Sequence, residues 1–171
     1  ELVAVYINIA DCYQQSGNFL ECSQYYRKAL ILADKTQNKA ERYSILSGLA
    51  KLYMEMENFQ EADIYFKKAE LEVEKSEPYQ RYFFAMARGT FYYISKDYAS
   101  SILWFHKALH IIESLHQPFN QALAEGNLGE LFILTGKADS ARYYLDRATN
   151  RFGKSYNNPA IRYYMEGLYA S

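Results

Sequence analysis

The chain has 171 residues, with 19 lysines and arginines against 20 aspartates and glutamates, so its formal net charge is −1. This near-neutral balance argues against a nucleic-acid-binding surface, which normally carries a basic excess. The sequence shows no signal peptide and no apolar run of about 18 residues that would span a membrane. Because Glu1 already lies in an apparent helical pattern and no methionine precedes it, we expect a fragment of a longer protein.

Amphipathic patterns separated by short polar turns predict eight helices. They span residues 2–16, 19–35, 39–56, 59–76, 79–95, 98–116, 119–135 and 138–152. A ninth helix is predicted at 159–170, as a C-terminal cap or half-repeat within 157–171. Pro78, Pro118 and Pro159 fall at predicted helix starts, where the missing N–H of proline is harmless.

The chain also repeats itself. A small residue followed three positions later by an aromatic one recurs at a regular interval, as Ala10 with Tyr13, Ala50 with Tyr53, Gly89 with Tyr92, and Gly129 with Phe132. The small residues are 40, 39 and 40 positions apart. A small residue lets two helices approach, and the neighbouring ring fills the space beside the contact. The pattern therefore predicts an all-α solenoid of helix-turn-helix repeats, over about 2–37, 38–77, 78–117 and 118–156. Because one repeat cannot bury its own faces, we expect a single domain over 1–171.

The first copy resembles the tetratricopeptide repeat family at nearly all of its motif positions. These are Tyr6, Ile9, Ala10, Tyr13, Gly17, Phe19, Cys22, Tyr26 and Ala29. Two later copies depart from the pattern, with Arg88 in the leucine position and Glu125 where a bulky apolar residue is usual. The resemblance implies a right-handed α-α superhelix of four such repeats plus a C-terminal helix. The period exceeds the usual length of about 34 residues, so HEAT-like packing is the alternative fold.

The resemblance further implies that the first helix of each pair lines a concave groove for a protein or peptide. The positions carried over are Asn8, Asp11, Gln15, Ser47, Lys51, Glu55, Met86, Thr90, Tyr93, Asn127, Glu130 and Ile133, with Ile7 and Gly126 beside them. Asn8 and Asn127 occupy places where chaperone-binding relatives hold a peptide backbone. Lys51 is almost the only cation in this set, so a clamp on a terminal carboxylate is not expected. A neutral or slightly basic peptide fits the predicted groove better.

Catalytic signals are nearly absent, and we predict neither an enzyme nor a cofactor, because no phosphate loop, nucleophile elbow or cysteine metal pattern occurs. His106 and His110 lie four residues apart and share a helix face, which suits a metal. No supporting ligand lies at an obvious spacing, so we interpret both as surface or partly packed side chains. Cys12 and Cys22 occupy helix-packing positions and are predicted to be buried thiols rather than a disulfide.

Adjacent aromatic residues recur in the predicted second helices, as Tyr25 with Tyr26, Tyr65 with Phe66, Trp104 with Phe105, and Tyr143 with Tyr144. Recurrence at a fixed phase is what core packing predicts. We expect one ring of each pair to point inward and its neighbour to pack against the next repeat.

Two classes of function follow. The first is a protein- or peptide-binding scaffold, as the sensor or docking part of a larger bacterial regulator. That regulator would be cytoplasmic or, alternatively, would place this segment in the periplasm from a membrane anchor. The second is a structural element that forms homo-oligomers through its terminal helices. In neither case do we expect this segment to contact nucleic acid or membrane.

Overall fold

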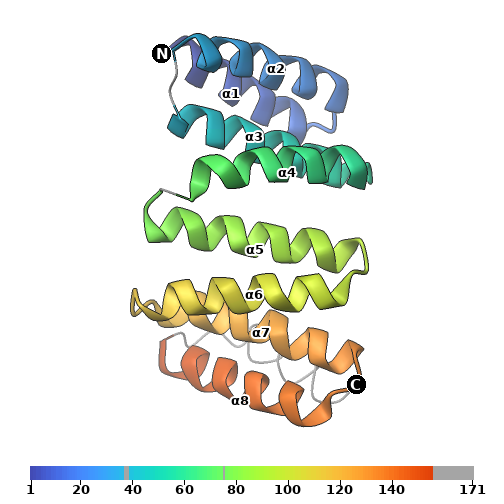
Figure 1. Ribbon diagram of the computed structural model, residues 1–171, viewed down its shortest axis with the longest axis vertical. Helices are drawn as coiled ribbons and strands as arrows, with labels where there is room; N and C mark the ends of the chain where they lie inside the picture. The colour runs from blue at the N-terminus through green and yellow to red at the C-terminus, as the bar shows by residue number, and fades with distance from the viewer. Residues whose placement is uncertain (37–38, 75, 156–171) are drawn as a thin grey trace. The chain divides into compact units, whose positions relative to one another are not determined.

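The computed structural model describes residues 1–36, 39–74 and 76–155, and every regular element in these ranges is an α-helix. The eight helices are α1 (Leu2–Gln15), α2 (Phe19–Thr36), α3 (Lys39–Glu55), α4 (Phe59–Val73), α5 (Pro78–Ile94), α6 (Tyr98–Glu113), α7 (Pro118–Leu134) and α8 (Ala138–Ser155) (Figure 1). Their bounds differ from the predicted ones by only a few residues at each end. The ninth predicted helix, at 159–170, lies outside the described residues.

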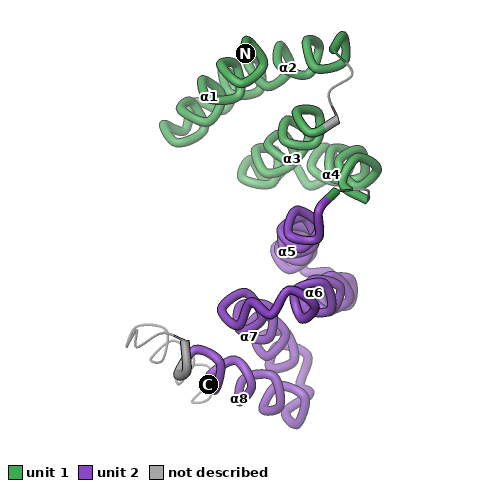
Figure 2. The backbone as a smooth tube through the Cα atoms, turned by 90° about the vertical axis from the view of Figure 1, so that its left-hand side faces the viewer, with its two compact units in different colours: residues 1–76 green, residues 77–171 purple. Residues whose placement is uncertain are grey.

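The helices belong to two compact units, residues 1–76 and 77–171 (Figure 2). In the first unit, α1 pairs with α2 and α3 pairs with α4, and α2 also packs against α3. In the second unit, α5 pairs with α6 and α7 pairs with α8, and α6 packs against α7. Each unit is therefore two helix-turn-helix repeats stacked on one another. One continuous domain over 1–171 stays a prediction.

The turn inside each helix pair has one residue in the left-handed region of backbone conformation. These residues are Gly17, Glu57, Lys96 and Gly136, with φ of 74°, 56°, 63° and 70°. Their positions repeat with the same spacing as the small residues of the sequence pattern. Where the next residue is Asn58 or Asp97, its side chain caps the second helix by accepting a hydrogen bond from a backbone N–H three residues on, at 3.2 and 3.1 Å. The turns are thus repeated units of structure, as the helices are.

Replacing Asp97 by alanine is expected to lower the free energy of unfolding by about 1 kcal/mol, because the cap of α6 is lost. Hydrogen bonds from Ser100 hold the pKa of Asp97 below its usual value. The stabilisation is therefore complete above the pKa of an unfolded aspartate, about 3.9, and is lost as the pH falls through the lower value of the folded state. Urea unfolding should show a difference in the free energy of unfolding between wild type and variant at pH 7, and this difference should become smaller near pH 3. Asp139→Ala, in the first turn of α8, is the matched control. A difference in the free energy of unfolding that stays the same in acid would contradict the assignment of Asp97 as the cap of α6.

Small residues lie where the two helices of a pair approach each other. A Cβ atom on Gly89 would lie 2.8 Å from the ring of Phe105, and one on Gly129 would lie 2.5 Å from Leu145 Cδ2. Ala10 and Ala50, at the equivalent places, are completely buried. The helix approach that the sequence pattern predicted is confirmed.

The paired aromatic residues of the second helices need a correction. Tyr26, Phe66 and Phe105 are buried, as predicted. In the first, second and fourth repeats, however, the neighbouring ring stacks on the aromatic residue of the first helix of its own pair, whereas Trp104 in the third repeat meets Phe84 edge to face. The ring pairs are Tyr25 on Tyr13, Tyr65 on Tyr53 and Tyr144 on Phe132, with centroids 5.6, 5.4 and 5.6 Å apart. In the fourth repeat the equivalent pair is Tyr144 with Leu145, and Tyr143 is exposed. The contact lies within a repeat because both rings point to the same side of one helix pair.

Both departures from the family pattern are buried charges with partners. Arg88 is 2% exposed, and its guanidinium lies 4.8 Å from the ring centroid of Tyr92 and donates to the Tyr92 hydroxyl at 3.0 Å. Glu125 is 0% exposed and accepts hydrogen bonds from Arg147 Nε at 2.7 Å and Arg151 Nε at 2.9 Å. A buried charge is tolerated when it has partners, which for Glu125 are two arginines and for Arg88 are an aromatic ring and a hydroxyl group.

Candidate functional site

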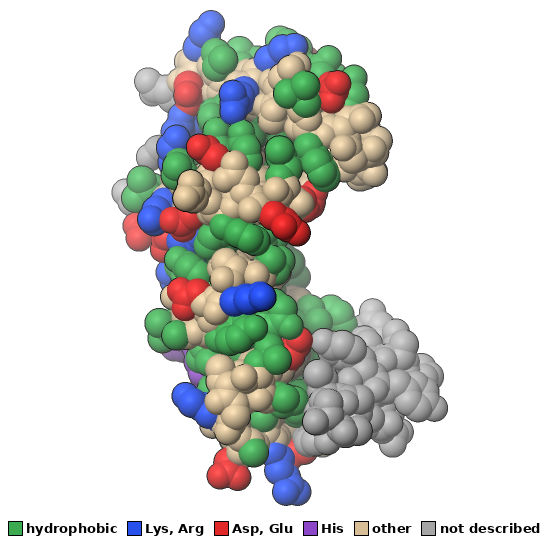
Figure 3. Space-filling model, turned by 90° about the vertical axis from the view of Figure 1, so that its right-hand side faces the viewer, with side chains coloured by type: hydrophobic (Ala, Val, Ile, Leu, Met, Phe, Trp, Pro, Cys, Tyr) green, Lys and Arg blue, Asp and Glu red, His purple; other side chains and the backbone are tan. Residues whose placement is uncertain are grey.

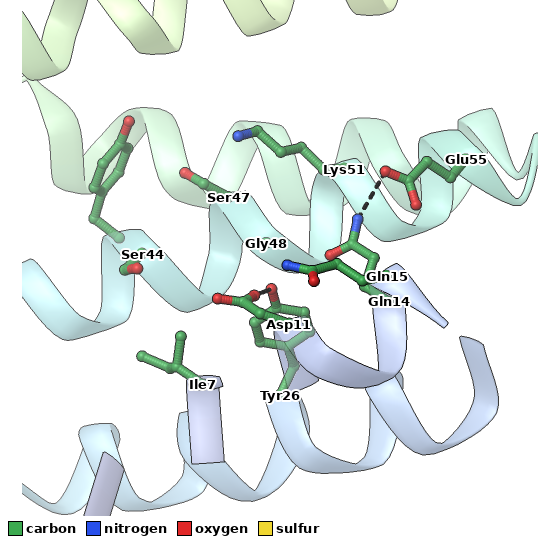
Figure 4. Close-up of a pocket in the computed structure, with 11 residues that line it drawn as sticks. Ile7, Asp11, Gln14, Gln15, Tyr26, Ser44, Ser47, Gly48, Lys51 and Glu55 are labelled. Atoms are coloured by element: carbon green, nitrogen blue, oxygen red, sulfur yellow. Dashed lines mark hydrogen bonds between the residues drawn. The ribbon is translucent and has the colours of Figure 1, made fainter. Parts of the chain in front are cut away.

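A pocket of about 570 Å³ opens between the two repeats of the first unit (Figure 4). Most of its lining side chains carry hydrogen-bonding groups. They are Ile7, Asp11, Gln14 and Gln15 from α1, Tyr26 from α2, and Tyr43, Ser44, Ser47, Gly48, Lys51 and Glu55 from α3. The pocket therefore contains every predicted groove residue of this unit except Asn8.

Helical spacing explains why these residues meet. Asp11 and Gln15 are four residues apart on α1, and Ser47, Lys51 and Glu55 follow the same spacing on α3. Residues at this spacing share one helix face. Figure 4 shows the α1 side chains facing those of α3 across the pocket. Asn8 lies on another side of α1, beside a shallow groove formed with Val5, Ile9, Cys12, Tyr13 and Ser16.

Neutral hydrogen-bond donors hold the two carboxylates of the pocket. The Tyr26 hydroxyl donates to Asp11 Oδ1, and Gln14 Nε2 donates to Glu55 Oε1 at 2.8 Å. Within residues 1–36 and 39–74, neither carboxylate forms an ion pair with Lys51 or another cation. Both negative charges therefore remain available to a bound molecule.

Two neighbouring groups respond to these charges. Burial, the hydrogen bond to Asp11 and the Asp11 charge raise the pKa of Tyr26 far above its usual value. Burial, followed by the charges of Asp11 and Glu55, raises the pKa of the Cys22 thiol to about 11. Tyr26 therefore stays protonated and donates to Asp11 at physiological pH, while Cys22 stays a neutral thiol. Two carboxylates and one lysine line the pocket, so the charges of its lining side chains sum to −1.

The predicted residues of the second unit lie on α5 and α7. They are Met86, Thr90 and Tyr93 on the first of these helices, and Asn127, Glu130 and Ile133 on the second. The Tyr93 hydroxyl donates to Glu130 Oε1 at 2.5 Å and so joins the two helices. Asn127 Nδ2 donates to the Leu123 carbonyl of its own helix at 2.9 Å, which turns its amide toward the backbone. Ile133 packs against the core.

Residues 1–70 match the family model of the tetratricopeptide repeat. This matched range is similar to the tetratricopeptide repeat and covers less than half of the chain. Solved structures support the same fold beyond the matched range, and no curated protein matches the sequence significantly. The tetratricopeptide repeat is a protein-interaction scaffold, and this statement holds for the fold rather than for any particular partner.

Three solved structures illustrate the likeness. BtubC (BKLC) from P. vanneervenii has a TM-score of 0.84 at 20% identity, covering 92% of this chain and 65% of that one. A Signal Transduction ATPase with Numerous Domains (STAND) protein with a tetratricopeptide repeat sensor, from Pyrococcus horikoshii, has a TM-score of 0.81 at 20% identity, covering 88% and 24%. The N-terminal domain of stress-induced protein-1 from C. elegans has a TM-score of 0.61 at 17% identity, covering 77% and 97%. The chain thus spans less than two thirds of the first two proteins, and these identities show the fold alone.

The sequence analysis missed several residues that line the pocket or hold equivalent positions in the second unit. Tyr26 reaches the pocket from a second helix, which the carried-over positions did not include. Ser44 lies six residues before the small residue of its repeat, and Phe83 and Leu123 hold the equivalent places in the second unit. Phe83 is 50% and Leu123 37% exposed. Repeat register was the signal that would have found these three positions.

The histidines and cysteines have no common site. His106 is half-buried, 5.5 Å from the ring of Tyr144 and 6.3 Å from that of Phe132, and burial lowers its pKa. Among the described residues, no three metal-ligating side chains gather around one point. Cys22 is buried as predicted, but the prediction for Cys12 is wrong, because Cys12 lies on the exposed side of α1.

The face of the molecule that Figure 3 shows has no strong preference for one charge. The face in Figure 3 carries acidic and basic side chains scattered among hydrophobic and neutral ones. In the part of the chain that the structure describes, no helix is long and apolar enough to cross a membrane.

Proposed function

We propose that this chain binds a protein or peptide and that the pocket between α1 and α3 holds the bound segment. The observation that carries this proposal is the convergence of polar side chains from two repeats on one open pocket. Amide, hydroxyl and carboxylate groups offer partners to the backbone and side chains of an extended peptide. The apolar side chain of Ile7 and the ring of Tyr43 supply contact area beside them.

The charges of the pocket favour a neutral or slightly basic segment. Asp11 and Glu55 are held by neutral donors and face a single lysine, Lys51. A terminal carboxylate would meet two anions, whereas a lysine or arginine side chain would meet opposite charge. Charge complementarity of this kind sets selectivity and association rate more than total affinity.

The α5–α7 face of the second unit is a second candidate contact area, argued separately. Phe83 and Leu123 are exposed there, and Tyr79 is 44% exposed with its ring 4.8 Å from that of Phe83. Exposed apolar side chains that gather on one face are typical of protein contacts. We expect this face to prefer apolar side chains of a partner.

At a finer level, we propose that the chain is the sensor or docking part of a larger regulator. The likeness to a STAND protein with a tetratricopeptide repeat sensor supports this role. In the full-length protein, a peptide bound by these repeats should change the activity of an adjoining domain. No such change would contradict the sensor role and leave the binding role intact. A cytoplasmic location stays a prediction.

The binding proposal predicts that Asp11→Asn and Glu55→Gln each weaken peptide binding about tenfold. A hydrogen bond to a charged group contributes about 1.5–3 kcal/mol, and 1.4 kcal/mol is a factor of ten. Peptides selected from a random display library against the wild-type chain provide the ligand. Their dissociation constants for each variant are measured by fluorescence polarisation.

Glu21→Gln is the control for that experiment, because Glu21 is an exposed carboxylate on α2 outside the pocket. All variants must first unfold at the same temperature as the wild type. Selected peptides that bind both pocket variants as tightly as they bind the wild type would place the binding site elsewhere on the chain.

A further inference from the structure

The helix α1 has an apolar face that is covered in later repeats but open in the first. Val5 is 48% exposed, Ile9 is half-buried and Cys12 is exposed. We call these three residues the outer face of α1. Figure 2 shows α3 and α4 on one side of the α1–α2 pair, with no described helix of this unit on the other side.

The repeat register identifies what this face corresponds to. In the second repeat, the equivalent residues are Ile45, Leu49 and Leu52, which are all 0% exposed in the helix against which α2 packs. In the fourth repeat they are Ala124, Leu128 and Leu131, also 0% exposed, in the helix against which α6 packs. In both cases the second helix of the preceding pair packs against the helix that carries them. The outer face of α1 has apolar residues at the same positions, but no described helix of this unit packs against them.

We propose that the outer face of α1 is a docking surface for one more helix pair of this same repeat type. The second helix of that pair lies along Val5, Ile9 and Cys12, as α2 lies along α3. The surface is separate from the polar pocket, and the inference does not depend on which ligand the pocket binds. An apolar face this exposed contributes binding free energy once a matching helix removes it from water.

The residue at position 8 restricts which aromatic side chain the partner can place against α1. Its equivalent in the second repeat is Gly48, where a Cβ atom would lie 2.6 Å from the Tyr26 ring of the preceding second helix. Asn8 has that Cβ atom, so a tyrosine placed like Tyr26 does not fit. The equivalent residue of the fourth repeat is also an asparagine, Asn127, and the helix before it carries Phe105 at the place of Tyr26. The expected partner is therefore a helix pair like α5–α6, whose second helix has a phenylalanine at the position that corresponds to Tyr26.

The chain itself supplies a probe of this kind. Residues 77–119, joined directly before Glu1 of the full chain, place the α5–α6 pair ahead of α1 in the register with which it precedes α7. The added segment contains no cysteine. Cys22 is buried with a raised pKa, so Cys12 is the thiol expected to react with an aromatic disulfide reagent under native conditions.

In the extended chain, Cys12 should react at least about tenfold more slowly than in the original chain, and the unfolding temperature should rise. Val5→Asp should restore fast reaction in the extended chain and leave the stability of the original chain nearly unchanged, because Val5 is exposed there. Added residues that are helical by circular dichroism while Cys12 reacts at its original rate would overturn the proposal. Added residues that stay unfolded would also overturn it. Protection of Cys12 that grows with the concentration of the original chain, together with a dimer mass, would show that a second copy covers the face instead.

Discussion

Replacing Arg147 and Arg151 together by methionine is expected to lower the free energy of unfolding by about 3–5 kcal/mol. The carboxylate of Glu125 is completely buried, and each of its oxygens accepts one arginine Nε, at 2.7 and 2.9 Å. Removing both cations leaves a buried negative charge without a partner. Methionine keeps much of the apolar stem that packs beside α7, so the loss reports the missing charges rather than missing volume.

A triple variant separates charge from packing. Adding Glu125→Leu to the two methionine substitutions removes the buried charge and should restore most of the lost stability, because apolar replacement of a whole buried ion group is commonly neutral or stabilising. Urea unfolding followed by circular dichroism measures all three chains. A triple variant as unstable as the double variant would show that the arginines act through packing. The Arg147 contacts with Glu113 and Tyr143 are exposed and are expected to contribute little.

Replacing Gly48 by alanine is expected to cost about 1–3 kcal/mol of stability, although alanine favours helix by about 1 kcal/mol over glycine. The new Cβ atom would lie 2.6 Å from the Tyr26 ring. That ring is 3% exposed, and its hydroxyl is bonded to Asp11, so a ring displaced by the new Cβ atom would strain or lose that bond. The same displacement should weaken binding of a peptide to the pocket.

Ser44→Ala is the matched control for the glycine variant, since Ser44 is an exposed position one turn earlier on α3. Thermal unfolding is measured for both chains, and peptide affinity is compared between the Gly48→Ala chain and the wild type. A Gly48→Ala chain as stable as the wild type would mean that the Tyr26 ring shifts freely, and the close contact would then not support the geometry of the pocket.

Local pattern and repeat spacing predicted most of the fold. Eight helices, the turns at Gly17 and Gly136, and the small residues at the helix approaches all follow from features that recur at the same spacing. These features depend on neighbours a few residues away or one period away. Both kinds of neighbour can be read directly in a repeated sequence.

The pocket was predictable in part. Asp11, Ser47 and Lys51 lie where helical spacing and repeat register place them. Tyr26 was not predicted there, because a second-helix side chain reaches the pocket only through the packing of α2 between α1 and α3. Asn8 was assigned by family position, yet it lies on another side of α1. Whether these residues bind a ligand stays a prediction.

Exposure and charge pairing were the least predictable properties. Cys12 has the pattern of a buried residue, but its side chain is exposed. Glu125 stood out only as a departure from the family pattern, since its partners come from α8, 22 and 26 residues further along the chain. Pairing of this kind depends on the helix approach in three dimensions rather than on spacing within one helix.

Site-specific photocrosslinking tests the binding pocket most directly. A benzophenone amino acid replaces Ser44, which lines the pocket, and in a second chain replaces Glu21, which lies outside it on α2. Each chain is irradiated with a peptide selected against the wild type, and mass spectrometry identifies the linked residues. We predict a crosslink from position 44 that excess unlabelled peptide abolishes, and none from position 21. A bound peptide that crosslinks from position 21 and not from position 44 would contradict the assignment of the pocket as the binding site.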